Sequence, residues 1–224
     1  MLWLDEDILA FPSILDAPNE ENIIALGGDL GPRRLLLGYS IGLFPWYNEG
    51  ETPILWQSPN PRFVLFPDQL TVNKSLRRSL KKQRYDITFN QCFEEVLHRC
   101  ASTPRDGQEG TWLNPTLIDA LTQLHHSGYA HSGEAWLEGR LVGGLYGISI
   151  GGVFFGESMF SEVSDASKVT FVKMVEHLTK AGFRMIDCQD YTPHLERFGA
   201  IKIDRTHFYA LLREYLRIKP SLNW

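Results

Sequence analysis

Three predicted strands joined by two very short turns constrain the fold more than any other feature of this sequence. Residues 135–137, 141–148 and 153–159 are rich in apolar side chains, and they are separated only by Glu138-Gly139-Arg140 and Gly151-Gly152. Connections this short join neighbouring antiparallel strands, whereas a parallel crossover needs about a dozen residues or more. We therefore expect an antiparallel meander and, with helices between other strands, an α+β fold.

A long helix and a further strand are predicted after the meander. Residues 166–181 carry an apolar stripe that includes Phe171, Met174 and Leu178, and Gly182 is expected to end this helix. The next strand runs to about residue 189, and further helices are predicted over 33–39, 115–127 and 206–217. The strand, helix, strand order between residues 153 and 189 suits an acyltransferase-type sheet.

Composition narrows the class of protein. Hydrophobic residues make up 43% and charged residues 22%, which are ordinary globular values. The formal charge of −5 means that a nucleic-acid partner must be held by a local basic patch. Cys92, Cys100 and Cys188 form no C-x-x-C pair, which indicates a reduced protein without a structural zinc site. With an acidic amino terminus and no membrane-spanning apolar run, we expect a cytoplasmic protein without a membrane anchor.

The first 60 residues differ from the rest of the chain. They are rich in proline and glycine turn signals, and they end at Ser58-Pro59-Asn60-Pro61, where two prolines favour an extended linker. We therefore predict a small N-terminal domain over residues 1–60 and a larger domain over residues 61–224.

Two strands carry acids where their neighbours are apolar. Strict alternation places Glu157 on one face with Val153, Phe155 and Met159. It likewise places Asp187 and Gln189 together on a face with Phe183 and Met185. Because an unpaired buried carboxylate is costly, each acid should have a hydrogen-bonding partner, a cation or a ligand. A structural polar cluster or a strand-end cap would explain the same pattern.

A cluster of five cations falls at helical spacing. They lie at i, i+3, i+4, i+7 and i+8, so a helix would align them on one face, here called the basic face: Lys74, Arg77, Arg78, Lys81 and Lys82. Phosphates of a nucleic acid would neutralise their mutual repulsion, but an ordinary solvated helix face has the same pattern.

Other chemical signals are few. Trp46 and Trp112 are predicted on loops, where they can stack on bases or lie buried between domains. Neither a Walker loop, a G-x-S-x-G elbow nor an H-E-x-x-H helix is present, and no histidines have metal-ligand spacing, so no metal is expected. No pyrophosphate-binding turn typical of acetyl-CoA enzymes follows a strand, which weighs against a nucleotide-carried acyl donor.

A series of short blocks resembles the leucyl/phenylalanyl-tRNA–protein transferases of bacteria. The blocks span nearly the whole chain: Ala25-Leu-Gly-Gly-Asp-Leu30, Gly42-Leu-Phe-Pro-Trp46, Leu55-Trp-Gln-Ser-Pro59, Gly110-Thr-Trp112, Leu141-Val-Gly-Gly144, Gly156-Glu-Ser-Met-Phe-Ser161, Ala166-Ser-Lys168 and Ile186-Asp-Cys-Gln189. An ordered series of this kind is far more specific than any single motif.

The resemblance implies an aminoacyltransferase that needs no cofactor. It would move leucine or phenylalanine, with methionine as a further candidate, from aminoacyl-tRNA to proteins that begin with arginine or lysine, and so mark them for degradation. It also implies a small N-terminal domain and an acetyltransferase-like (GNAT-like) C-terminal domain with a mainly antiparallel mixed sheet. We expect a cytoplasmic monomer.

The resemblance also implies roles for particular residues. Trp46 and Trp112 would flank the terminal adenine of the tRNA, while Glu157, Asp187 and Gln189 stand at the positions of functional polar residues. An apolar pocket for the amino-acid side chain would include Phe154, Ile186, Leu121, Leu145, Met174 and Leu178. Since alternation points Phe154 away from Glu157, a twist or β-bulge is required if both line one cavity.

We hypothesise a mechanism in which Gln189 orients the attacking amine. The Gln189 carbonyl oxygen would accept from the attacking amine, and Asp187 would polarise Gln189 or receive the proton through water. Glu157 would bind a cation, either the α-ammonium of the donor or the basic side chain of the acceptor. The alternatives are an acyl-CoA-dependent N-acyltransferase and a non-catalytic binder of RNA or peptide termini.

Overall fold

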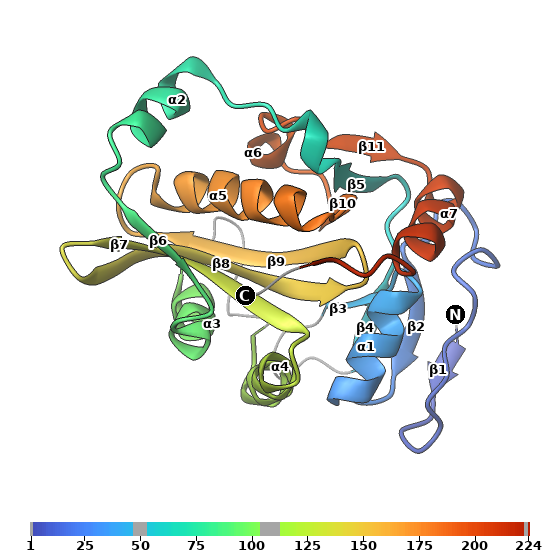
Figure 1. The fold of residues 1–224 in the computed structure, drawn as a ribbon. Coiled ribbons are helices and arrows are strands. Elements are labelled where there is room, and N and C mark those ends of the chain that lie inside the picture. Colours follow the sequence, from blue (N-terminus) through green and yellow to red (C-terminus); the bar gives the residue numbers. More distant parts are fainter. Residues whose placement is uncertain (1, 47–52, 104–112, 222–223) are drawn as a thin grey trace.

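The strands of the protein form two sheets. The structure is a computed structural model of the 224-residue chain and describes residues 2–46, 53–103, 113–221 and 224. The smaller sheet has the order β1-β2-β4-β3, with β1 (Leu2–Leu4) parallel to β2 (Ile23–Gly27) and with β3 (Phe44–Trp46) and β4 (Leu55–Gln57) paired in antiparallel fashion. The helix α1 (Pro32–Ser40) lies beside it (Figure 1).

The larger sheet has seven strands in the order β11-β5-β10-β9-β8-β7-β6. The strands are β5 (Arg62–Leu65), β6 (Asp86–Phe89), β7 (Ala130–Leu137), β8 (Arg140–Ile150), β9 (Val153–Ser161), β10 (Met185–Gln189) and β11 (Ile201–Ile203). The predicted meander is β7-β8-β9, and both of its pairings are antiparallel. Since β9 and β10 run parallel while the other described pairs of this sheet are antiparallel, the predicted α+β fold with a mainly antiparallel mixed sheet is confirmed.

Helices cover both faces of the larger sheet (Figure 1). The long helix α5 (Ala166–Ala181) crosses one face, while α3 (Phe93–Ser102) and α4 (Pro115–His126) lie on the other. The remaining elements are the short 3-10 helix η1 (Pro67–Gln69) and the helices α2 (Lys74–Lys81), α6 (Pro193–Glu196) and α7 (Arg205–Tyr215).

Local capping signals set several helix ends. The Asn114 side chain accepts a hydrogen bond from the backbone N–H of Leu117, and Pro115 opens α4 at the predicted start of this helix. Gly182 ends α5 in the left-handed conformation with φ of 93°, also as predicted. Asn73 caps α2 in the same way as Asn114 caps α4.

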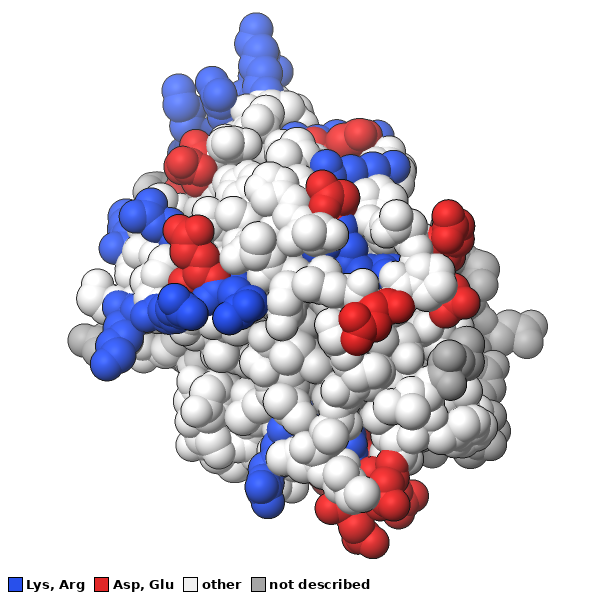
Figure 2. Space-filling model, turned by 90° about the vertical axis from the view of Figure 1, so that its right-hand side faces the viewer, with Lys and Arg blue, Asp and Glu red and all other residues white. Residues whose placement is uncertain are grey.

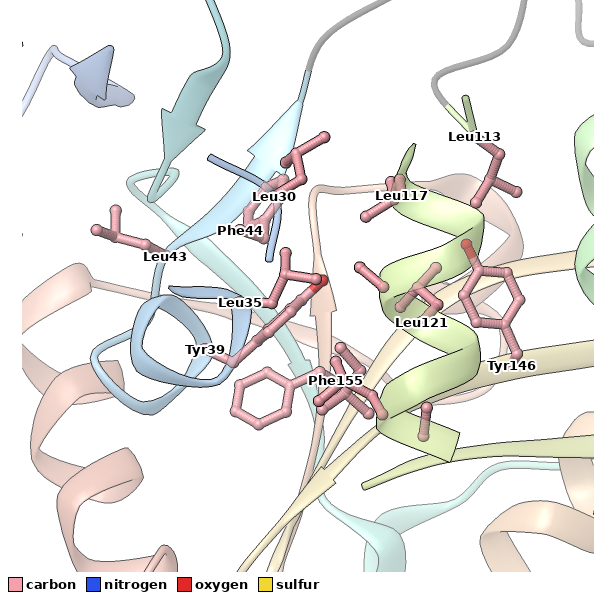
Figure 3. Packing of buried hydrophobic residues seen from close by; sticks show 14 of the residues in the cluster. Leu30, Leu35, Tyr39, Leu43, Phe44, Leu113, Leu117, Leu121, Tyr146 and Phe155 are labelled. Carbon is pink, nitrogen blue, oxygen red and sulfur yellow. The ribbon is translucent and has the colours of Figure 1, made fainter. Parts of the chain in front are cut away.

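The hydrophobic core divides into two clusters, one on each face of the larger sheet. The α5-side core joins α2 and α5 to residues such as Phe154 and Ile186. The α4-side core joins α3 and α4 to the N-terminal residues, and Figure 3 shows Tyr39 of α1, Phe155 of β9 and Leu121 of α4 meeting there. Because this cluster contains residues from both sheets, the division at residue 60 stays a prediction.

Two register shifts change which face the strand residues occupy. Tyr146 pairs with Ser158 and Gly147 pairs with Gly156, so Glu157 is the extra residue of a β-bulge in β9. A second shift lies between Asp187 and Gln189, where Gln189 has a left-handed φ of 62°.

Strict alternation is therefore wrong across the bulge in β9, and it is also wrong just before β10. Val153 and Phe155 belong to the α4-side core, but Met159 packs against the α5-side core. Met185 lies in the α4-side core and Phe183 in the α5-side core for another reason: Phe183 precedes β10, so strand alternation does not apply to it. The bulge required to bring Phe154 and Glu157 to one cavity is present.

Candidate active site

An apolar cavity of about 350 Å³ opens where β8, β9 and β10 meet α5. Its apolar wall includes Leu145, Phe154, Phe171, Met174 and Ile186. Leu145, Phe154, Met174 and Ile186 are four of the six residues predicted for the aminoacyl pocket. They come from three strands and a helix, and they line one cavity. Phe171 is a wall residue that was not among the six predicted.

The other two predicted pocket residues do not line this cavity. Leu121 lies on α4 and packs in the α4-side core, on the opposite face of the sheet. Leu178 is fully buried in the α5-side core one helical turn beyond Met174, and it is not part of the cavity wall. The pattern of apolar residues could not distinguish packing within a core from exposure to a cavity inside it.

The polar end of the cavity is a carboxylate–amide pair. Gln189 Nε2 donates a 2.7 Å hydrogen bond to Glu157 Oε1, and both residues are partly buried. The β-bulge of β9 turns Glu157 toward this end, and the positive φ of Gln189 turns the end of β10 to meet it. Since the amide N–H₂ is directed to the carboxylate, the amide oxygen of Gln189 is left as an acceptor.

Burial raises the pKa of Glu157 from 4.5 to about 7. The nearby Asp187 adds to the rise, whereas hydrogen bonding from Tyr39 and Gln189 and the charge of Arg62 oppose it. The buried hydroxyl of Tyr39 interacts with the same carboxylate, and burial together with that carboxylate raises the pKa of Tyr39 well above its ordinary value. Tyr39 therefore remains a neutral donor beside an acid that titrates near neutral pH.

Asp187 lies behind this pair and does not contact the cavity. Its carboxylate forms a bidentate ion pair with Arg62, with Nε–Oδ1 at 2.8 Å and Nη2–Oδ2 at 2.6 Å, and both side chains are fully buried. Oδ1 also accepts from the backbone N–H of Gln189 at 2.9 Å. Asp187 thus contacts the Gln189 backbone, while Glu157 contacts its side-chain amide.

The Arg62 guanidinium lies between two aromatic rings. Its central carbon is 4.8 Å from the ring centroid of Phe44 and 4.6 Å from that of Phe208. A guanidinium held over aromatic faces and paired with a carboxylate is a rigid unit. It fixes Asp187, which in turn fixes the bend at Gln189.

Arg62 and Tyr39 are site residues that were not predicted from the sequence. Arg62 precedes the apolar run Phe63–Leu65 of β5, and a cation entering a buried strand signals a buried partner. Tyr39 lies on the buried face of α1 and offers no such signal, because aromatic residues are common on buried helix faces.

Two further wall residues bear on the chemistry. Burial raises the pKa of the Cys188 thiol, so it is protonated and a poor nucleophile. Burial lowers the pKa of His194, which is favoured as the neutral imidazole. Within the described ranges no three His, Cys, Asp or Glu side chains come together in a way that could hold a metal ion.

The tryptophans and the basic face lie outside this inner site. Trp46 lines the mouth of the cavity with 38% of its surface exposed, although it ends the edge strand β3 and not a loop as expected. Trp112 lies outside the described residues. All five cations of the basic face are exposed, and none forms an ion pair with another described residue. In Figure 2 basic side chains project from the top of the molecule, at the level where α2 lies in Figure 1.

The fold and the site together are those of an α+β protein with an apolar cavity that ends at a carboxylate–amide pair, the kind of site in which enzymes bind small groups. Comparison with known proteins gives the family. The profile described as leucyl/phenylalanyl-tRNA protein transferase matches residues 64–213, and the profile of the N-terminal domain of that family matches residues 28–60. The chain belongs to the leucyl/phenylalanyl-tRNA protein transferase family.

Individual relatives agree with the profiles. The leucyl/phenylalanyl-tRNA–protein transferase of Stutzerimonas stutzeri is 50% identical over 225 residues, which cover 100% of this chain and 99% of the relative. The enzyme of the same name from Anaeromyxobacter sp. is 53% identical over 93% of this chain and 88% of its own length.

A solved structure, that of L-PGS from Bacillus licheniformis, is 11% identical over 71% of this chain and 66% of that one, with a TM-score of 0.43, which is too low to bear on function. None of the helices in the described stretches is long and apolar enough to cross a membrane.

Proposed function

We propose that this chain transfers leucine or phenylalanine from aminoacyl-tRNA to the N-terminal arginine or lysine of acceptor proteins. The observation that carries the proposal is the cavity, whose apolar wall ends at the Glu157–Gln189 pair. Family membership supports the donor and the reaction class, since the relatives are named for the transfer of these two amino acids. Methionine is a further candidate donor because the wall is apolar and contains the adaptable side chain of Met174.

The donor side chain occupies the apolar wall in this proposal. Leu145, Phe154, Met174 and Ile186 contact it, and Trp46 at the mouth stacks on the terminal adenine together with Trp112. The basic face of α2 contacts tRNA phosphates farther away. The ester is thereby directed with its carbonyl carbon toward Gln189.

The transfer needs the acceptor amine to be neutral and aligned. An α-amino group has an ordinary pKa of about 7.7–8.0, so part of it is neutral near neutral pH. The free amide oxygen of Gln189 accepts a hydrogen bond from this amine and directs its nitrogen at the ester carbon. A C–N bond forms and the C–O bond to the tRNA ribose breaks. Alignment of two bound reactants accelerates such a step without a strong base.

In this proposal Asp187 and Glu157 have roles that differ from those expected from the sequence. Asp187 is occupied by Arg62 and the Gln189 backbone, so it acts as a positioning residue. Glu157 polarises the Gln189 amide, and with a pKa of about 7 its carboxylate can receive the amine proton, which passes on to the ribose oxygen. Glu157 therefore takes the proton-accepting part proposed for Asp187.

Several coarser features complete the proposal. The chain acts as a cytoplasmic monomer with a small domain over residues 1–60 and a catalytic domain over residues 61–224, and it needs no cofactor because the ester is already activated. The new N-terminal leucine or phenylalanine marks the acceptor for degradation. The three described cysteines are free, which fits a reducing compartment.

The test uses the purified protein, tRNA charged with radiolabelled leucine, and peptides that begin with arginine or alanine, without ATP, added metal or acyl-CoA. Label on the arginine peptide alone is the expected result. Label from acyl-CoA but not from aminoacyl-tRNA would favour the N-acyltransferase alternative. Charged tRNA that binds without transfer to either peptide would leave a binding protein and refute the catalytic roles.

A further inference from the structure

Asp190 is an acid of the cavity wall that has no part in the proposed transfer step. It follows Gln189 directly, lines the same cavity and is partly buried. Its carboxylate makes no hydrogen bond or ion pair with the described part of the chain. Burial raises its pKa and the nearby Asp187 adds to the rise, while the charge of Arg62 opposes it without contacting the Asp190 carboxylate.

The neighbouring acids are not available in the same way. Asp187 is bonded to Arg62, and Glu157 interacts with Gln189 and Tyr39, both neutral donors. Glu157 was expected to bind a cation, but these two donors already engage its carboxylate. Of the two acids that line the cavity, Asp190 is the one whose oxygens have no described donor.

We propose that the Asp190 carboxylate binds the positively charged side chain of the acceptor's N-terminal residue. This inference rests on the proposed function and names the residue that selects the acceptor. A guanidinium or ammonium group brought to a partly buried carboxylate forms a charge-assisted hydrogen bond and relieves the cost of the buried charge.

The position of Asp190 suits this task. Consecutive Cα atoms lie about 3.8 Å apart, so Asp190 and Gln189 can be reached by two ends of one residue. The α-amine of the acceptor lies at the Gln189 amide oxygen, and its side chain extends to Asp190 while the donor side chain fills the apolar wall. A neutral N-terminal residue would align its amine equally well but would leave Asp190 without a partner.

The test compares peptides that begin with arginine and with citrulline, its neutral near-isostere. For the wild type and each variant, the ratio of kcat/KM for the two peptides is measured with leucyl-tRNA as the donor. Because the donor is the same for both peptides, any effect of a substitution on donor binding drops out of this ratio. We expect Asp190→Asn to lower the arginine-to-citrulline ratio by at least about tenfold, mainly through KM for the arginine peptide. Asp190→Glu, which keeps the charge, should restore much of the preference.

The control is Glu214→Gln on α7, which makes the same change of charge at an exposed site outside the cavity wall. It should leave the ratio unchanged. Binding of leucyl-tRNA to Asp190→Asn, measured by filter retention, verifies that this variant is folded.

The outcomes separate this inference from the proposed function. If the wild-type protein transfers leucine and Asp190→Asn keeps the full arginine preference, Asp190 is not the acceptor site and the proposed function stands. If Asp190→Asn and Glu214→Gln lower the ratio equally, the effect is one of net charge, and the inference is overturned. Absence of transfer by the wild-type protein would overturn both.

Discussion

Replacing Arg62 with methionine should destabilise the protein by about 3–5 kcal/mol, because it leaves the Asp187 carboxylate buried without a cation. The magnitude follows from the geometry: both side chains are fully buried, and two hydrogen bonds of 2.8 and 2.6 Å join them. Methionine keeps much of the apolar contact with Phe44 and Phe208, so the loss is mainly electrostatic. For a chain of this size the melting temperature should fall by roughly 6–20 °C.

The assay is urea denaturation followed by tryptophan fluorescence, with the free energy of unfolding obtained from the midpoint and slope. The double variant Arg62→Met, Asp187→Asn removes both charges, so it should be more stable than the sum of the two single losses predicts. Arg99→Met is the matched control, because Arg99 pairs with Glu95 and Glu162 at a site where 41% of its side chain is exposed. Its loss should be far smaller than that of Arg62→Met, because solvent screens an exposed ion pair. Additive single losses, or an Arg62→Met effect no larger than that of the control, would refute the reasoning.

Three further predictions concern the site and the tRNA contact. Because burial raises the pKa of Glu157 from 4.5 to about 7, the folded chain holds a proton that the unfolded chain has released, so stability should fall as the pH rises between these values. In the Glu157→Gln variant this contribution to the fall should be absent, so its free energy of unfolding should decrease less over this pH range than that of the wild type. The same pH dependence of stability in the wild type and the variant would contradict the prediction. Gln189→Glu places a second carboxylate at the 2.7 Å contact, where the pair must share a proton, so transfer should persist with an altered pH–rate profile, while Gln189→Ala should lose most activity. Equal loss in both variants would point instead to a specific amide role. Neutralising the basic face should weaken tRNA binding and reduce the salt slope by roughly 0.7–0.9 per lost phosphate contact; an unchanged slope in filter-binding titrations would make it a solvated surface.

Local signals predicted much of the fold. The meander of β7, β8 and β9 follows from turns too short for any other connection, and the ends of α4 and α5 follow from Asn114 and Gly182. The basic face also follows from spacing alone, since residues three and four apart share one side of a helix. These features depend on residues close together in the chain.

The internal geometry of the site could be predicted only in part. Glu157 and Gln189 were selected as functional residues, but alternation assigned their neighbours to the wrong faces because it cannot place an extra residue in a strand. Phe154 and Met174 reached the cavity as expected, while Leu121 did not, because an apolar side chain on α4 and one on α5 have the same pattern but cover opposite faces of the sheet.

The sequence by itself determined the elements, the antiparallel meander and the presence of acids that need partners. Only the tertiary structure decided which partners they have: Arg62 for Asp187, 125 residues away, and Gln189 with Tyr39 for Glu157. The physical reason is that propensity and capping act over a few residues, whereas a buried charge is stabilised by whichever group the packed sheet brings within about 3 Å.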